Sequence, residues 1–279
     1  MNPDRFRVLL QSDPPGIANS PAIPKTIVAI HVGRTMEIGC RRNGRYHRGL
    51  YVHGDIDIIP PGTASRWELK ERDHALILAV PACLLHAAAQ ESGGDPARLE
   101  IVNRYQIRDP RIEHIGWALK AEIEAGCPSG RLYFDGLALA LSALLIERHS
   151  SAAGASRVPA QGMSGRRLRD VISYIEENLS QELSLKEIAG VVGLSVSHCK
   201  TAFRKSMGLP IHQYVIQRRV ERARELLGAG RLSIGQIAAE TGFSHESHLA
   251  YHIRRAFGVS PASLRGGRGN EVAATAGQA

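Results

Sequence analysis

The chain has 279 residues, of which 43% are hydrophobic and 22% are charged, which excludes a wholly disordered chain and allows two folded domains. No apolar run approaches the ~20 residues needed to cross a bilayer, and residues 1–15 lack the apolar core of a secretory signal. The net charge of +8 is uneven, because residues 1–165 carry +2 and residues 166–279 carry +6. This imbalance favours a polyanion, most often nucleic acid, as the partner of the C-terminal part.

The four cysteines are far apart and show neither a CxxC pair nor zinc-ligand spacing. A disulfide framework and a structural zinc site are therefore not expected. A cytoplasmic protein that does not enter the membrane fits these observations.

The first part of the chain, up to about Pro81, has short apolar runs between turn residues, which are typical of a small antiparallel β unit. Asn43-Gly44 is a strong hairpin-turn signal. The expected strands cover residues 26–32, 50–53, 56–59 and 74–80.

From about Pro110 the apolar residues recur at helical spacing. Two helices are expected, separated by residues 126–130, and each has one face to bury. Their apolar positions are Ile112, Ile115, Leu119 and Ile123 in the first helix and Leu137, Leu141, Leu144 and Leu145 in the second.

Residues 150–165 are small, polar and punctuated by glycine and proline, which predicts a flexible linker. Residues 266–279 have no apolar periodicity and are expected to be disordered. The predicted organisation is therefore an N-terminal domain over 1–149, a linker over 150–165, a C-terminal domain over 166–265 and a tail.

The C-terminal domain contains an internal repeat with a spacing of about 49 residues. Leu-Ser, Ile-Ala and Gly-apolar-Ser elements recur in the same order, first in residues 183–195 and again in residues 232–244. Each copy predicts a short helix capped by Ser184 or Ser233, a turn at a glycine able to take positive φ, and a second helix.

This pattern is typical of a helix-turn-helix, here over 185–206 and 234–257. A purely structural helical repeat is the alternative, but basic residues on and just after each second helix favour DNA binding. A helix over 211–227, closed by Gly228, joins the copies. At about 25 Å it could hold two recognition helices roughly one DNA turn, about 34 Å, apart.

These residues resemble the AraC/XylS family of bacterial transcription regulators over residues 166–265. The most specific parts are the two repeat copies and the closing segment from Phe257 to Arg265, which includes Ser260-Pro261. The resemblance implies a seven-helix DNA-binding domain with two helix-turn-helix units. It also implies that the protein binds double-stranded promoter DNA and recruits, or interferes with, RNA polymerase, as an activator for example.

The resemblance also assigns contacts to DNA. Base-reading positions of the family fall on Ser197, Lys200 and Thr201 in the first unit and on Glu246, Ser247, Ala250 and Tyr251 in the second. Candidates for phosphate contacts, which position the protein without reading sequence, are Arg204, Lys205, Arg254 and Arg255. The chain departs from the family at Tyr251, where an arginine is usual, and at Cys199, which we expect to be a small buried hydrophobe.

The N-terminal half resembles the family's sensor domain less closely. Residues 54–62 match the skeleton of the second cupin motif, which implies a cupin-like antiparallel β-barrel followed by a helical dimerisation hairpin. The fold class expected for the whole chain is α+β. Ser65 stands where metal-binding cupins have a histidine, so no metal or cofactor is expected. His47, His53 and Trp67 could line a pocket for a small-molecule effector, or could have no such role.

The leading hypothesis is a homodimeric, sequence-specific transcription regulator that responds to a small molecule and is not an enzyme. No GxSxG, P-loop or GxGxxG motif occurs in the chain. Two alternatives stay open at this point. One is a constitutive DNA-binding protein whose N-terminal half only dimerises, and the other is a cupin-type enzyme tethered to DNA.

Overall fold

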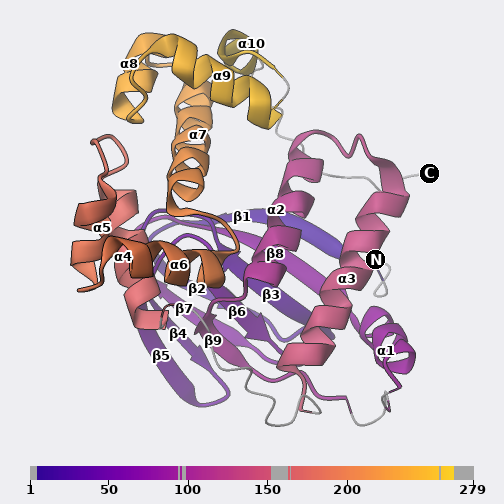
Figure 1. Cartoon of the computed structure of the whole chain (residues 1–279). Coiled ribbons are helices and arrows are strands. Elements are labelled where there is room, and N and C mark those ends of the chain that lie inside the picture. The colour runs from indigo at the N-terminus through magenta and orange to yellow at the C-terminus, as the bar shows by residue number, and fades with distance from the viewer. Residues whose placement is uncertain are drawn as a thin grey trace. The chain divides into compact units, whose positions relative to one another are not determined.

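The computed structural model describes residues 5–93, 95, 99–151, 163, 165–257 and 259–266. The chain divides into two compact units, Met1–Ile172 and Ser173–Ala279, and the division falls inside helix α4 (Gly165–Glu177) (Figure 1). Most of the predicted linker over 150–165, and all but Gly266 of the predicted tail, lie outside the described residues.

The N-terminal unit contains two antiparallel sheets within its described residues. The five-stranded sheet has the order β1 (Arg7–Asp13), β8 (Asp73–Pro81), β3 (Lys25–His31), β6 (Ile56–Ile59) and β9 (Arg104–Ile107). The four-stranded sheet has the order β2 (Gly16–Ser20), β7 (Ser65–Leu69), β4 (Met36–Arg42) and β5 (Arg45–Tyr51).

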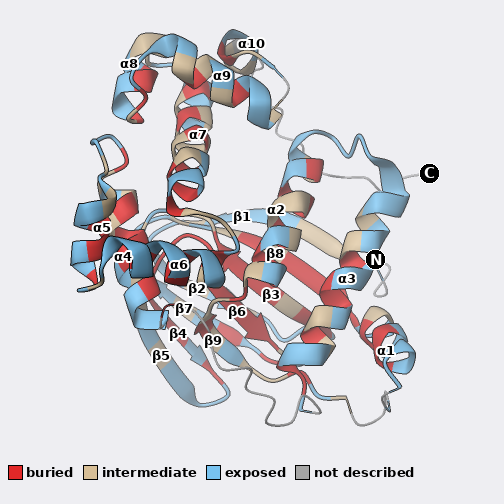
Figure 2. Cartoon of the chain, viewed as in Figure 1, coloured by how far each residue is buried: buried red, intermediate tan, exposed pale blue. Residues whose placement is uncertain are grey.

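Helices cover one face of the five-stranded sheet. In Figure 1, α2 (Pro110–Glu124) and α3 (Gly130–His149) lie across it, and α1 (Ala82–Glu91) follows β8 directly. Successive side chains of a strand point to opposite faces of the sheet. The even-numbered residues of the central strands form the core beneath the helices. Figure 2 shows most of these strands in red, the colour of buried residues. The strand side of this core is Val28, Ile30, Ile56, Ile58, Leu76, Leu78 and Val80.

The expected cupin-like barrel is not closed. Each sheet keeps its own hydrogen-bonded ladder, and β1 and β2, although consecutive, pair with different partners, β8 and β7. Pro14 and Pro15 separate these two strands, and proline has no N–H with which to extend a ladder. At the other edge, β9 meets β5 through side chains, since Gln106 Nε2 donates to the Leu50 carbonyl at 2.5 Å. The architecture is therefore a two-sheet sandwich.

The predicted strands over 26–32, 56–59 and 74–80 are confirmed as β3, β6 and β8, to within a residue at their ends. The one over 50–53 is wrong in its second half, because β5 ends at Tyr51 and His53 lies in the turn before Gly54. The Asn43-Gly44 turn is confirmed as well, because both residues have positive φ, 47° and 73°, between β4 and β5. Strands β1, β2, β4, β7 and β9 and helix α1 are not among the predicted elements. These strands are short or carry polar residues, so local hydrophobic patterning does not identify them.

The C-terminal unit is helical throughout its described residues. Both Ser184 and Ser233 form the predicted capping boxes, with Glu187 and Gln236 respectively. The linking helix was predicted to close at Gly228, which is wrong, because it continues to Ala229 and ends at Gly230, which has φ of 67°. The helices are α4, α5 (Leu185–Val191), α6 (Val196–Met207), α7 (Ile211–Ala229), α8 (Ile234–Glu240), α9 (Glu246–Phe257) and α10 (Pro261–Gly266).

Gly116 sets how closely α2 can pack on the sheet, because a Cβ at this position would overlap Cδ1 of the fully buried Ile30. We expect Gly116→Val to lower the free energy of unfolding by about 2–3 kcal/mol, since overpacking forces side chains and backbone to move. Gly136→Val in α3 is the control, because no atom lies within 4 Å of its Cβ position. Urea unfolding followed by tryptophan fluorescence measures both, since Trp67 and Trp117 are in this unit. Equal effects of the two substitutions would contradict the prediction.

Candidate DNA interface

The first helix-turn-helix consists of α5 and α6. Ile188 and Ala189, the Ile-Ala element of the first repeat copy, are buried, and Gly193 makes the turn with φ of 65°. The Ser195 hydroxyl then caps α6 by accepting from the His198 N–H at 3.3 Å. Local sequence thus fixes both the turn and the start of the second helix.

Helix α6 has two distinct faces. Cys199 and Phe203 are buried, and burial raises the pKa of the Cys199 thiol, so the predicted hydrophobic role of this cysteine is confirmed. The opposite face is exposed to solvent. It carries all five side chains that the sequence assigns to DNA in this unit, Ser197, Lys200, Thr201, Arg204 and Lys205.

Four of these five side chains line one groove. Lys200, Thr201, Arg204 and Lys205 share it with His212, which is in the first turn of α7, and the turn from Gly208 to Ile211 forms its floor. Sequence reasoning missed His212 because it lies beyond the predicted helix-turn-helix. Three of these side chains are cationic, and Thr201 and His212 can form hydrogen bonds. Side chains of these two kinds make the phosphate contacts of DNA-binding proteins.

The second helix-turn-helix consists of α8 and α9. Glu246, Ser247, Tyr251, Arg254 and Arg255 are exposed, and Ala250 is half-buried. Glu246 bends back over α8, because Gly235 leaves room for it: a Cβ on Gly235 would lie 2.6 Å from Glu246 Oε1. Of the positions assigned to base reading in this unit, Ser247 and Tyr251 are therefore the more available to a ligand.

A row of histidines lies beside this exposed face, and the sequence analysis did not identify it. The Nε2 atoms of His248 and His252 are 3.1 Å apart, and the Ser244 hydroxyl contacts Nδ1 of both His245 and His248. Burial lowers the pKa of His252, and the neighbouring His248 and Arg255 lower it further. The fold therefore favours the neutral His252 ring.

Helix α7 connects the two units of the repeat, as Figure 1 shows. The Arg219 guanidinium donates to the carbonyls of Leu179 at 3.0 Å and Gln181 at 2.7 Å, both ahead of α5, and to that of Gly242 at 2.6 Å, in the turn before α9. Its neighbour Arg218 binds Glu176 of α4 at 2.6 Å. Arg218 and Arg219 thus join α4 and the segment before α5 to the turn before α9.

The residues assigned to an effector pocket are not brought together. Trp67 lines a cavity between the two sheets, but His47 and His53 do not. His47 faces Gln106 Oε1 at 3.0 Å. His53 stacks flat on Trp117 of α2, with ring centroids 4.7 Å apart.

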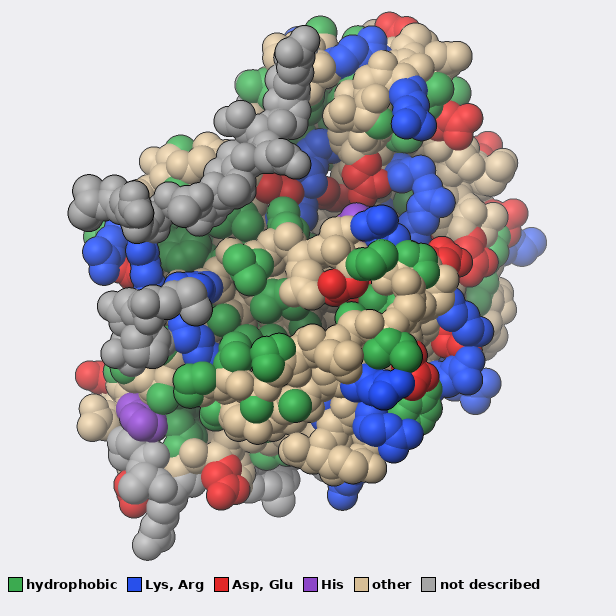
Figure 3. Space-filling view, turned by 180° about the vertical axis from the view of Figure 1, so that it is seen from behind, with side chains coloured by type: hydrophobic (Ala, Val, Ile, Leu, Met, Phe, Trp, Pro, Cys, Tyr) green, Lys and Arg blue, Asp and Glu red, His purple; other side chains and the backbone are tan. Residues whose placement is uncertain are grey.

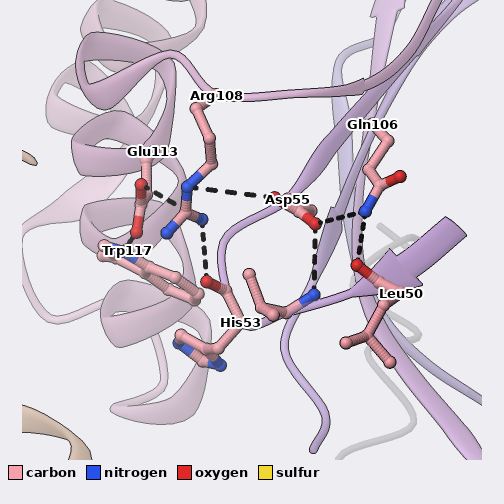
Figure 4. Close-up of polar contacts among 8 residues, drawn as sticks. Leu50, His53, Asp55, Gln106, Arg108, Glu113 and Trp117 are labelled. Atoms are coloured by element: carbon pink, nitrogen blue, oxygen red, sulfur yellow. Dashed lines mark hydrogen bonds and ion pairs between the residues drawn. The ribbon is translucent and has the colours of Figure 1, made fainter. Parts of the chain in front are cut away.

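A buried polar network surrounds His53 (Figure 4). Arg108 donates to the His53 carbonyl at 2.7 Å and faces the carboxylates of Asp55 and Glu113 at 3.9 and 3.7 Å. Gln106 Nε2 donates to Asp55 at 3.0 Å. His53 is therefore held in a network that joins the start of the cupin-like segment to α2, on the side of the sheet away from the cavity.

Comparison with known proteins agrees with this geometry. A family described as "Helix-turn-helix domain" matches residues 188–267. The transcriptional activator AarP of Providencia stuartii is 31% identical over 98 residues, which are 35% of this chain and 73% of AarP. The chain belongs to the AraC family of transcriptional regulators.

Two further matches also span only part of this chain. The probable transcriptional regulator LumQ of Photobacterium leiognathi is 34% identical over 89 residues, so the match spans only 36% of LumQ and 32% of this chain. An AraC-type regulator structure from Chromobacterium violaceum is 31% identical, covers 39% of this chain and 96% of that one, and has a TM-score of 0.37. The helix-turn-helix match over residues 188–267 and the regulator relatives support DNA binding and transcription regulation.

Two further findings concern the residues that the structure describes. Within them, no group of three or more His, Cys, Asp or Glu side chains is arranged to hold a metal ion. None of their helices combines the length and the apolarity that a membrane span requires.

Gly193 and Gly242 occupy the same place in the two AraC-type repeats but differ in surroundings. A Cβ on Gly193 would meet nothing, whereas one on Gly242 would overlap the Leu179 carbonyl and lie 2.7 Å from Arg219 Cζ. We expect Gly193→Ala to lower the free energy of unfolding by about 1–2 kcal/mol, because of the positive φ alone. We expect Gly242→Ala to lower it by more than about 3 kcal/mol, because the new Cβ also overlaps its neighbours. Urea unfolding followed by far-ultraviolet circular dichroism compares them. Equal costs would show that the Arg219 contacts do not constrain the turn.

Proposed function

We propose that this protein regulates bacterial promoters by binding specific sequences in double-stranded DNA with both helix-turn-helix units. The observation that carries the proposal is the exposed face of α6, where Lys200, Thr201, Arg204 and Lys205 share one groove. On this proposal α6 and α9 enter successive major-groove segments. Lys200 and Thr201 meet base edges there, while Arg204 and Lys205 hold phosphates.

The distance along α7 suits this arrangement. The helix has 19 residues and is therefore about 28 Å long, close to the ~34 Å of one DNA turn. The second unit reads DNA through Ser247, Ala250 and Tyr251, with Arg254 and Arg255 on phosphates and Glu246 partly withdrawn over Gly235. The bound protein acts in the cytoplasm by recruiting or obstructing RNA polymerase.

The N-terminal unit supplies sensing and dimerisation on this proposal. The cavity between the sheets, with Trp67 in its wall, gives a small molecule a place to bind, which favours a sensor over a unit that only dimerises. Helix α3 offers the dimer interface, because Leu132, Tyr133 and Leu139 are large hydrophobic side chains on its surface, with Leu132 87% exposed.

A selection from random duplexes, followed by salt titration of the selected site, tests DNA recognition. We expect Lys200→Ala with Thr201→Ala to relax the selected sequence. We expect Arg204→Ala with Lys205→Ala to weaken binding to all duplexes and to lower the slope of log K against log salt by about 2. Arg131→Ala, which removes an exposed arginine of the N-terminal unit, is the control and should change neither. Equally tight binding of the wild type to every duplex would refute specific recognition.

Analytical ultracentrifugation tests the dimer interface. We expect Leu132→Asp with Leu139→Asp to shift the full chain from dimer to monomer, since carboxylates would be desolvated between apolar helices. Leu50→Asp is the control, because Leu50 is similarly exposed, at 51% against 46% for Leu139, but lies on β5. A dimer that survives the double substitution places the interface elsewhere.

A further inference from the structure

The cavity between the two sheets is built by strand alternation. While the even-numbered residues of the central strands pack under the helices, odd-numbered residues of the same strands face the opposite sheet and line the cavity. They include Ile27 and Ala29 of β3 and Ala75, Ile77 and Ala79 of β8. The cavity holds about 530 Å³, well within the range of sites for small organic ligands. Protein interiors seldom leave such a gap, so this face of the sheet is shaped for an occupant.

Most of the wall is apolar and the cavity opens to solvent. Hydrophobic side chains gather across the middle of the face seen in Figure 3. Leu9 and Ile23 both line the cavity and are 51% and 37% exposed, which places its mouth at β1 and at the segment before β3. Ile38, Ile59, Trp67 and Leu69 continue the apolar wall inside.

Asp57, Tyr51 and Ser65 form one polar cluster in the cavity wall, which also includes Lys25, His31 and Asp73. Asp57 and Tyr51 line the cavity side by side, and the guanidinium of the fully buried Arg42 pairs with the Asp57 carboxylate. Ser65 is directly opposite Arg42 in the β4–β7 register, so the two side chains share a face. The Ser65 hydroxyl is buried, lines the cavity and has no hydrogen-bond partner among the described residues.

This cluster limits the charge and the polarity of the ligand that the cavity can accept. Arg42 and Asp57 already neutralise each other, and Arg42 also lies 3.9 Å from the centre of the Tyr105 ring. A charged head group placed beside this pair would therefore find its counter-ion already neutralised, and burying the charge there is costly. Gln11, Asn19 and Thr63 also line the cavity, but most of the wall is apolar, so a molecule with many hydroxyls would leave several of them against apolar side chains. One hydroxyl or carbonyl is what Ser65 and Tyr51 can satisfy.

We propose that the cavity binds an uncharged, mainly apolar molecule carrying a single hydroxyl or carbonyl, with that group at Ser65 and the Tyr51–Asp57 pair. The inference rests on the sensing role proposed above and names the chemistry of the effector. It makes Ser65, Tyr51 and Asp57 the residues that set ligand specificity, in place of the predicted His47 and His53.

Three probes that share one alkyl chain and differ in the head group, together with one polyhydroxylated probe, test this proposal. The full-length protein is titrated at neutral pH with 1-octanol, octanoate, octylammonium and, as a polyhydroxylated probe, glucose. Thermal stability and the fluorescence of Trp67, in a Trp117→Phe background, report binding. We expect octanol to raise the melting temperature and change Trp67 emission. We expect octanoate and octylammonium to bind at least about tenfold more weakly and glucose not to bind.

Substitutions locate the binding. Ser65→Ala should weaken octanol binding by about 2- to 10-fold through loss of one hydrogen bond, and Ser12→Ala on β1 is its control. Ala29→Phe should abolish binding by filling the cavity. Binding of octanoate as tight as that of octanol, or octanol binding that survives Ala29→Phe, would overturn the proposal.

Operator binding measured on the same samples separates the two proposals. A protein that binds its selected DNA site but no octyl probe refutes the ligand chemistry and leaves the regulator role intact. A protein that binds octanol but shows no sequence preference on DNA refutes the regulator role instead.

Discussion

The hydrogen bonds of Arg219 are the constraint on which the DNA-binding unit depends. One guanidinium satisfies three backbone carbonyls, two ahead of the first helix-turn-helix and one in the turn of the second. Such carbonyls need a partner once they leave water, and a fixed fork of donors can serve several of them at once. Helix α7 therefore joins the two halves of the repeat through the hydrogen bonds of the half-buried Arg219 as well as through its length. The close approach at Gly242 follows from the same contacts.

The N-terminal unit depends on how the two faces of its five-stranded sheet are buried. Its five-stranded sheet uses one face for the helices and the other for the cavity, so the middle of β3 and of β8 is a continuous apolar run, as burial on both faces requires. Two buried polar groups stand out, the Arg108 network beside α2 and the Arg42–Asp57 pair between the sheets. In both, opposite charges lie close together, which is the condition for keeping them inside.

Much of the C-terminal unit could be predicted because its signals are local. Capping serines, turn glycines and helical spacing act within a few residues, and the internal repeat displays them twice. The cavity and the role of Arg219 depend on contacts between residues far apart, which no short window contains. Trp67 lines the cavity from β7, whereas His53, assigned to the same pocket, lies in the turn after β5 and stacks on α2. The barrel expectation failed for the same reason, since residues 54–62 describe one strand and turn but not how sheet edges meet.

The two helix-turn-helix units have diverged in chemistry. The first presents a groove of cations, and the second presents Tyr251 beside a row of histidines, with its glutamate folded back over Gly235. Because the two helix-turn-helix units differ and are joined in a fixed order, the chain has a direction along any duplex that both units contact. Its binding site therefore has a forward and a reverse orientation that are not equivalent.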